Sequence, residues 1–144
     1  MCAAARRRGV TAALGGFGLL LAGCSGLSLD DRAGLSCIDD TPQCVAQREK
    51  TLKSMLADKD HRWVREAPTA RAHATGVRLF AFRSKKSELS CDDLVHGRRE
   101  AEAVPKILKG HQGLSPAQVS RATLFAADVQ KELVAEIKRR RCRA

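Results

Sequence analysis

Apolar residues recur in steps of three and four along the last third of the chain, which places them on one face of an α-helix. The residues that follow this spacing are Val119, Ala122, Ala126, Val129, Leu133 and Ile137. Ser115 and Pro116 come just before them, and these residue types are preferred at the cap and first turn of a helix. The pattern predicts a long final helix that packs this face against the rest of the domain.

A weaker pattern of the same kind predicts a helix from about Thr41-Pro42 to Asp58. Threonine caps helices well, and proline at the first helical position loses no hydrogen bond. The apolar positions at helical spacing in this segment are Val45, Leu52, Met55 and Leu56. The charged stretch after this helix, residues 59–67, is predicted to be a connector whose Trp63 fills part of the core.

Residues 69–83 admit two interpretations. Thr69 can cap a helix in which His73, Val77 and Phe80 share one face, whereas residues 77–82 also alternate as they would in a strand. No partner strand or hairpin turn is evident in the rest of the sequence, and an isolated strand leaves its backbone groups unpaired. We therefore expect a helix here.

Ser90 and Asp93 have the spacing of a capping box and predict a third helix over residues 91–103, ending before Pro105. With the elements above, this makes four helices joined by short connectors. The sequence therefore predicts an all-α fold, a small antiparallel bundle of about four helices stapled by disulfides.

The number and positions of the cysteines predict these disulfides. Cys37, Cys44, Cys91 and Cys142 are an even set within the helical part, as is typical of exported domains, so we expect two disulfides. In an up-down bundle the starts of the first and third helices and the end of the fourth share one pole, where all four thiols would meet. Three pairings are possible. Because larger loops remove more unfolded-chain entropy, we favour Cys37 with Cys142 and Cys44 with Cys91.

The first residues have the composition of an export signal. Arginines at positions 6–8 precede an uncharged apolar run from Val10 to Leu21, which is too short for a comfortable membrane span. The run ends in the sequence Leu-Ala-Gly-Cys at positions 21–24, which resembles the lipobox of bacterial lipoproteins. The resemblance implies that the chain is cut before Cys24 and that Cys24 is lipidated.

This resemblance divides the chain into a signal peptide (1–23), a lipidated tether (24–36) and a helical domain (37–144). It implies a protein of the cell envelope, held at a membrane by its lipid. Ser25, rather than an aspartate, follows the cysteine, which by the same resemblance implies the outer membrane on its periplasmic side. The segment SCIDDTPQC, residues 36–44, and the basic, cysteine-bearing end also resemble small uncharacterised proteobacterial lipoproteins, a resemblance that implies no activity.

The formal net charge of the chain is +10, and the densest positive run lies at its end. That run consists of Lys138, Arg139, Arg140, Arg141 and Arg143. Cations in a last turn are favoured by the helix dipole, and they also form a candidate docking surface for an anionic envelope polymer or an envelope protein. Arg78, Arg83, Lys85 and Lys86 would extend the surface if their helix ends beside it. Nucleic acid is not an expected partner in that compartment.

Residues suited to catalysis are few. Asp58, Asp60 and His61 form the one tight group of carboxylates and imidazole, but no recognisable motif places a nucleophile or oxyanion donor beside them. No CxxC or HxxxH pair indicates a metal site, and no motif indicates a cofactor. The leading expectation is a non-enzymatic envelope lipoprotein. The alternative is a small-ligand-binding or hydrolytic protein with its site near His61.

Overall fold

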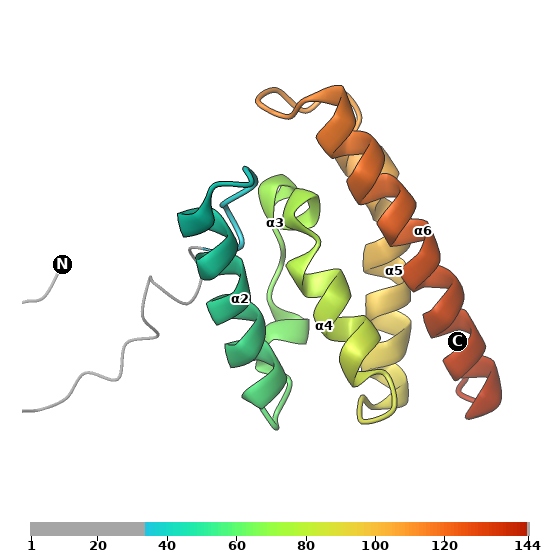
Figure 1. Ribbon diagram of the computed structural model, residues 1–144. Helices are drawn as coiled ribbons and strands as arrows, with labels where there is room; N and C mark the ends of the chain where they lie inside the picture. Colours follow the sequence, from blue (N-terminus) through green and yellow to red (C-terminus); the bar gives the residue numbers. More distant parts are fainter. Residues whose placement is uncertain (1–33, 144) are drawn as a thin grey trace, which may run out of the picture.

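The computed structural model describes residues 34–143, and this part of the chain is all-α, as predicted. Its elements are α2 (Pro42–Ala57), the 3-10 helix η1 (Arg62–Arg65), α3 (Ala70–Thr75), α4 (Val77–Lys85), α5 (Cys91–Leu108) and α6 (Pro116–Arg139). Figure 1 shows α5 and α6 as an antiparallel hairpin on one side, α2 on the other, and α4 between them. Within the described residues, α2 packs against α4, and α4 in turn packs against α5 and α6.

Polar caps start the helices at the predicted positions. Thr41 Oγ1 accepts a hydrogen bond from the backbone N–H of Cys44 at the start of α2. Thr69 Oγ1 accepts one from the backbone N–H of Ala72 at the start of α3. Ser90 and Ser115 each form a capping box with the residue three positions later. These bonds satisfy N–H groups that have no partner within the helix, so the local sequence determines where α2, α3, α5 and α6 begin. By contrast, η1 and α4 begin without a side-chain cap.

The core lies between α4, α5 and α6 and is closed by Trp63 from η1. The Trp63 ring is 6% exposed and meets the edge of Phe82 at a centroid distance of 4.7 Å, which confirms its predicted place in the core. Gly97 of α5 lies directly beneath Phe82, because a Cβ at position 97 would come within 2.5 Å of the ring. The predicted inner face of α6 is confirmed from Ala122 to Ile137, whose residues are buried at the expected spacing, while Val119 at its start is half-buried.

The helix expected over residues 69–83 is present, but it is two helices rather than one. Gly76 has a φ of 69°, a left-handed conformation that glycine adopts without strain, and it ends α3 and begins α4. His73 and Val77 are buried, whereas Phe80 is 43% exposed. The shared face predicted for these three residues is therefore wrong, because the chain changes direction between them.

The predicted end of the third helix is also wrong. We expected α5 to stop near Ala103, ahead of Pro105, but it continues to Leu108. Val104 and Leu108 have no exposed surface. Continuing the helix places both side chains in the core, and this burial outweighs the hydrogen bond that proline cannot donate.

Two disulfides are present, as expected, but the pairing is not the one we favoured. Cys37 pairs with Cys44, and Cys91 pairs with Cys142. Figure 1 shows the reason: α2 begins at the upper end of the molecule, whereas α5 begins and α6 ends at the lower end. The four cysteines therefore do not share one pole.

Arg78, which we expected on the basic surface, is instead 2% exposed. Its Nε and Nη2 atoms donate to the two carboxylate oxygens of Glu100 at 2.8 and 2.7 Å, and Nη1 donates to the carbonyl of Trp63 at 2.6 Å. The two-pronged guanidinium matches the carboxylate, so both charges are satisfied inside the molecule.

Candidate functional site

The predicted basic residues lie at the end of α6, where the backbone turns back on itself. Arg141 has a φ of 54°, and the N–H of Cys142 donates to the carbonyl of Ile137 at 3.0 Å. This 6→1 bond is the usual way to satisfy carbonyls at a helix end, although glycine more often takes the left-handed position. The turn carries Cys142 back toward α5.

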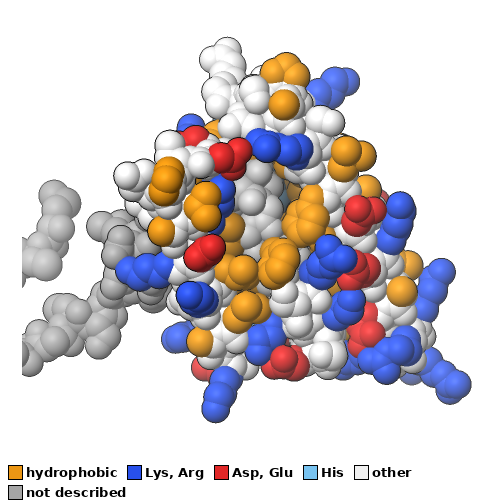
Figure 2. Space-filling view, in the orientation of Figure 1, with side chains coloured by type: hydrophobic (Ala, Val, Ile, Leu, Met, Phe, Trp, Pro, Cys, Tyr) orange, Lys and Arg blue, Asp and Glu red, His pale blue; other side chains and the backbone are white. Residues whose placement is uncertain are grey.

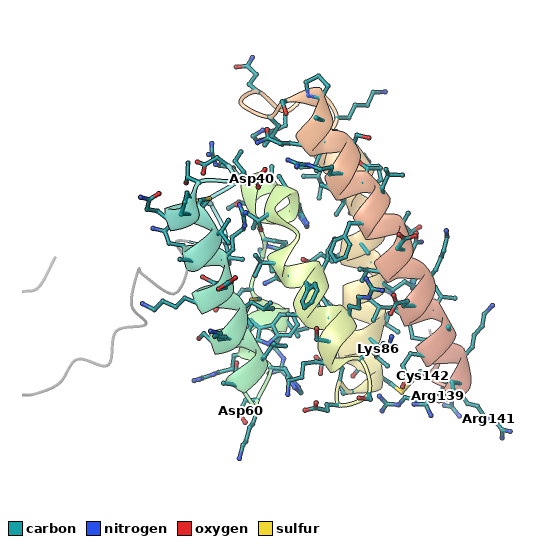
Figure 3. The ribbon with its side chains drawn as sticks, in the orientation of Figure 1. Asp40, Asp60, Lys86, Arg139, Arg141 and Cys142 are labelled. Carbon is teal, nitrogen blue, oxygen red and sulfur yellow. A yellow bond between two sulfur atoms is a disulfide. The ribbon has the colours of Figure 1, made fainter. Side chains whose placement is uncertain are left out.

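Two interactions then fix this turn to the rest of the molecule. Cys142 is bonded to Cys91 at the start of α5, and Arg140 donates from Nη1 to the carbonyl of Leu89. In Figure 3, Lys86, Arg139, Arg141 and Cys142 are all labelled at the lower end of the molecule, and Arg141 points away from it. The basic run is thus held in place by the fold.

The end of α4 adds Arg83, Lys85 and Lys86 to the same region, as expected from the sequence, whereas Arg78, which was also expected there, is buried. Arg83 and Lys86 both pair with Glu132 of α6. We define the basic pole as Arg83, Lys85, Lys86, Lys138, Arg139, Arg140, Arg141 and Arg143. Figure 2 shows Lys and Arg side chains gathered at the lower right, over the ends of α4 and α6.

Glu132 and Glu136 lie beside the basic pole and pair with some of its cations. The hydrogen bond from Lys86 lowers the pKa of Glu132, with Arg83 contributing, and the hydrogen bond from Arg139 lowers the pKa of Glu136. Both carboxylates are ionised at neutral pH and neutralise part of the positive charge.

Three cations of the basic pole remain without a partner. Within residues 34–143, the side chains of Lys138, Arg141 and Arg143 make no hydrogen bond or ion pair. By contrast, Arg139 pairs with Glu136 and Arg140 with a backbone carbonyl. The predicted basic run therefore divides into two arginines with structural partners and three exposed cations available to an anion.

The carboxylate of Asp58, near His61, is bonded to backbone groups. Asp58 accepts hydrogen bonds from the N–H groups of Asp60 and Arg62 at 3.1 and 2.8 Å, which shapes the turn between α2 and η1. His61 occupies this turn with a φ of 49°. Asp60 extends from the lower end of α2 in Figure 3, away from the other labelled residues.

One group of metal-ligating residue types comes together in the described residues. Ligand atoms of Cys37, Asp39 and Cys44 lie within 4.8 Å of one another. However, the two sulfurs are bonded to each other, and Arg48 Nη1 lies 3.4 Å from Cys44 Sγ. A thiolate is the form of cysteine that binds metals, and a neighbouring guanidinium repels a cation, so this group is poorly suited to hold one.

A groove between α2 and α6 was not predicted from the sequence. Its volume is about 360 Å³, and residues of α3 and α4 line it between these two helices. The residues that line the groove are Ile38, Asp40, Val45, Arg48, Glu49, Leu52, Ala74, Thr75, Gly76, Val77, Phe80, Gln118, Arg121, Ala122 and Phe125. Figure 2 shows it as a central hollow with hydrophobic side chains around its lower part. The spacing of Val45 and Phe80 gave no sign of it, because a pattern marks apolar positions without telling whether another helix covers them.

Comparison with known proteins gave no match to any family, to any curated protein or to any solved structure. Among the described residues, no helix combines the length and apolar character that crossing a bilayer requires. Cys24, the predicted lipidation site, lies outside the described residues.

Proposed function

We propose that this chain is a non-enzymatic, lipid-anchored protein of the bacterial cell envelope that presents the basic pole to an anionic partner. The signal peptide (1–23), lipidation at Cys24 and a position at the outer membrane, facing the periplasm, belong to this proposal. Two disulfides support it, because disulfides persist in proteins exported to an oxidising compartment.

One observation carries the binding role: Lys138, Arg141 and Arg143 have no ionic or hydrogen-bond partner among the described residues, and they lie at a helix end fixed by the Cys91–Cys142 disulfide. A fixed cluster of like charges attracts an anionic surface without first having to be ordered. Near such a surface each cation contributes on the order of 1 kcal/mol, and the attraction falls off within a Debye length.

The binding role is tested with the triple variant Lys138→Gln, Arg141→Gln and Arg143→Gln. We expect retention on vesicles containing phosphatidylglycerol to fall by roughly 100-fold at low salt, from three contributions of about 1 kcal/mol. Retention should weaken with added NaCl, and the helical circular dichroism should stay unchanged, since these exposed side chains make no hydrogen bond or ion pair within the described residues.

The matched control removes the same charge from exposed positions elsewhere: Lys53→Gln, Lys106→Gln and Lys109→Gln. If binding follows net charge alone, both triple variants lose the same retention, and the basic pole has no special role. Equal losses would therefore contradict the proposal.

The lipid anchor has its own test. Cys24→Ala should abolish incorporation of radiolabelled fatty acid and shift the protein from the detergent phase to the aqueous phase. Several acyl chains hold a protein at a membrane stably, whereas one chain alone is marginal. Unchanged labelling of the variant would rule out Cys24 as the lipidated residue.

A further inference from the structure

We propose that the groove between α2 and α6 binds a small, ring-bearing apolar molecule that carries no net charge. This is separate from the basic pole and does not depend on the envelope role. A volume of about 360 Å³ falls within the range of small-molecule sites.

The walls of the groove are apolar and partly exposed. Val45 and Leu52 project from α2, while Phe80 projects from α4 with 43% of its surface exposed. Phe125 of α6 completes the opposite wall. Two phenylalanine rings on facing elements offer the edge and face contacts that another ring prefers, and an exposed apolar patch with a polar rim is typical of a binding site.

One end of the groove is closed. Gln118 of α6 donates from Nε2 to the carbonyl of Ile38 at 3.2 Å, and Arg121 Nη1 lies 3.5 Å from Asp40 Oδ2. Asp40 is labelled at this upper end in Figure 3, between α2 and the start of α6. These contacts join α6 to the segment just before α2 and so cross this end of the groove. A compact molecule therefore fits the groove better than a long peptide helix running through it.

The mouth of the groove carries balanced charge. It is lined by two guanidinium groups, Arg48 and Arg121, and two carboxylates, Asp40 and Glu49. Arg48 already donates to the carbonyls of Cys37 and Asp39 and pairs with Asp40. A charged ligand would therefore lie close to rim groups of its own sign, whereas a neutral ligand would not face this repulsion.

The neutral fluorescent probe N-phenyl-1-naphthylamine tests this inference. Its binding is compared with that of 8-anilino-1-naphthalenesulfonate, which has the same ring system plus a negative charge. Both are titrated into the full chain carrying Cys24→Ala, so that no attached lipid contributes to the signal. We expect saturable binding of the neutral probe, about tenfold tighter than that of the anionic one, which is the cost of leaving a charge poorly matched.

Phe80→Ala in the same background should weaken binding of the neutral probe by about tenfold, because it removes one ring of the wall. Leu124→Ala is the matched control: Leu124 is 67% exposed on α6 and does not line the groove, so binding should not change. Light scattering on the same samples should report a monomer.

Three outcomes would overturn the inference. The first is no saturable binding of the neutral probe, or equal binding by the Phe80→Ala variant. The second is tighter binding of the anionic probe, which would mean that the rim selects charge. The third is a dimer that Phe80→Ala dissociates, since the occupant of the groove would then be a second copy of the chain.

Discussion

Three ionisable residues meet inside the molecule, at the contact of α3, α4 and α5. Arg78 and Glu100 form a buried pair, and His73 Nδ1 lies 3.9 Å from Glu100 Oε1 without a hydrogen bond to it. Removing one partner of such a pair leaves an uncompensated buried charge, which usually destabilises a protein by about 3–5 kcal/mol. The protein therefore depends on keeping both partners of the pair, although the pair itself adds little net stability.

His73 makes the stability of this protein depend on pH. Burial lowers the pKa of His73 from its ordinary value of 6.5, and this outweighs the opposite effect of Glu100, while Arg78 lowers the pKa further. Above pH 6.5 the imidazole is neutral in both the folded and the unfolded chain. Below it, the unfolded chain takes up the proton more readily. We expect the free energy of unfolding, measured by urea denaturation, to fall as the pH drops from 6.5 to 5.

His73→Phe should reduce this dependence, because it removes the titrating group and keeps a ring in the core. The matched control is His96→Phe on the exposed side of α5, which should retain the wild-type profile. The pKa values of Glu132 and Glu136 are lowered from 4.5, so their stabilising effect is lost only at more acidic pH. A His73→Phe profile that still falls between pH 6.5 and 5 would contradict the assignment.

At this scale the sequence predicted Trp63 correctly and Arg78 wrongly. A tryptophan among charges has few favourable places other than the core. An arginine, however, is buried only when a carboxylate lies opposite, and Glu100 is 22 residues away in the chain. The sequence offers no local signal for that partner, since the pairing depends on how α4 packs against α5.

The helices themselves follow the sequence closely at their starts and less closely at their ends. Caps act within three residues, so Thr41, Ser90 and Ser115 mark real beginnings. Helix ends depend on packing. Helix α5 continues through Pro105 because burying Val104 and Leu108 contributes more than the local preference of proline to end a helix. The break at Gly76 was only partly predictable, since glycine permits a break between α3 and α4 without requiring one.

Pro105→Ala should stabilise the protein. Proline at this position leaves the carbonyl of Ala101 without its helical donor, and alanine restores the N–H. Because proline also restricts the unfolded chain, and because the site is near the helix end, we expect a net gain of about 1–2 kcal/mol in urea denaturation.

Lys106→Ala is the control for that experiment, since Lys106 is an exposed neighbour in the same turn, and its effect should stay within about 0.5 kcal/mol. A loss of stability in Pro105→Ala would show that α5 needs a bend here to pack against α6.

For the whole molecule, the two disulfides close loops of very different size. Cys37 and Cys44 are 7 residues apart, whereas Cys91 and Cys142 are 51 apart. The pairing predicted from the largest loops was wrong. The entropy of the unfolded chain determines how much a disulfide stabilises the protein, but it does not determine which thiols lie close together. The thiols that meet are those whose Cα atoms the fold brings to 5.4 and 5.5 Å. The groove was unpredictable for a related reason, as it arises from the gap between α2 and α6.

The difference in loop size predicts a difference in stability. Replacing Cys91 and Cys142 together by alanine should cost about 4 kcal/mol, and replacing Cys37 and Cys44 together should cost about 2 kcal/mol, by the entropic estimate. Thermal unfolding of the two double variants provides the comparison. Equal losses would mean that native contacts at the cysteines, rather than loop closure, determine their contribution.

The Cys91–Cys142 bond also decides how the molecule would carry tension. If the chain is pulled from residue 34 and from Arg143, the force passes from α4 into Cys91, crosses the sulfur bond and leaves through Cys142. While that bond is intact, the segment between the two cysteines lies outside this covalent path. A separation of 51 residues corresponds to roughly 170 Å of extended chain. Reduction of this single bond would add that length to the extensible part of the protein.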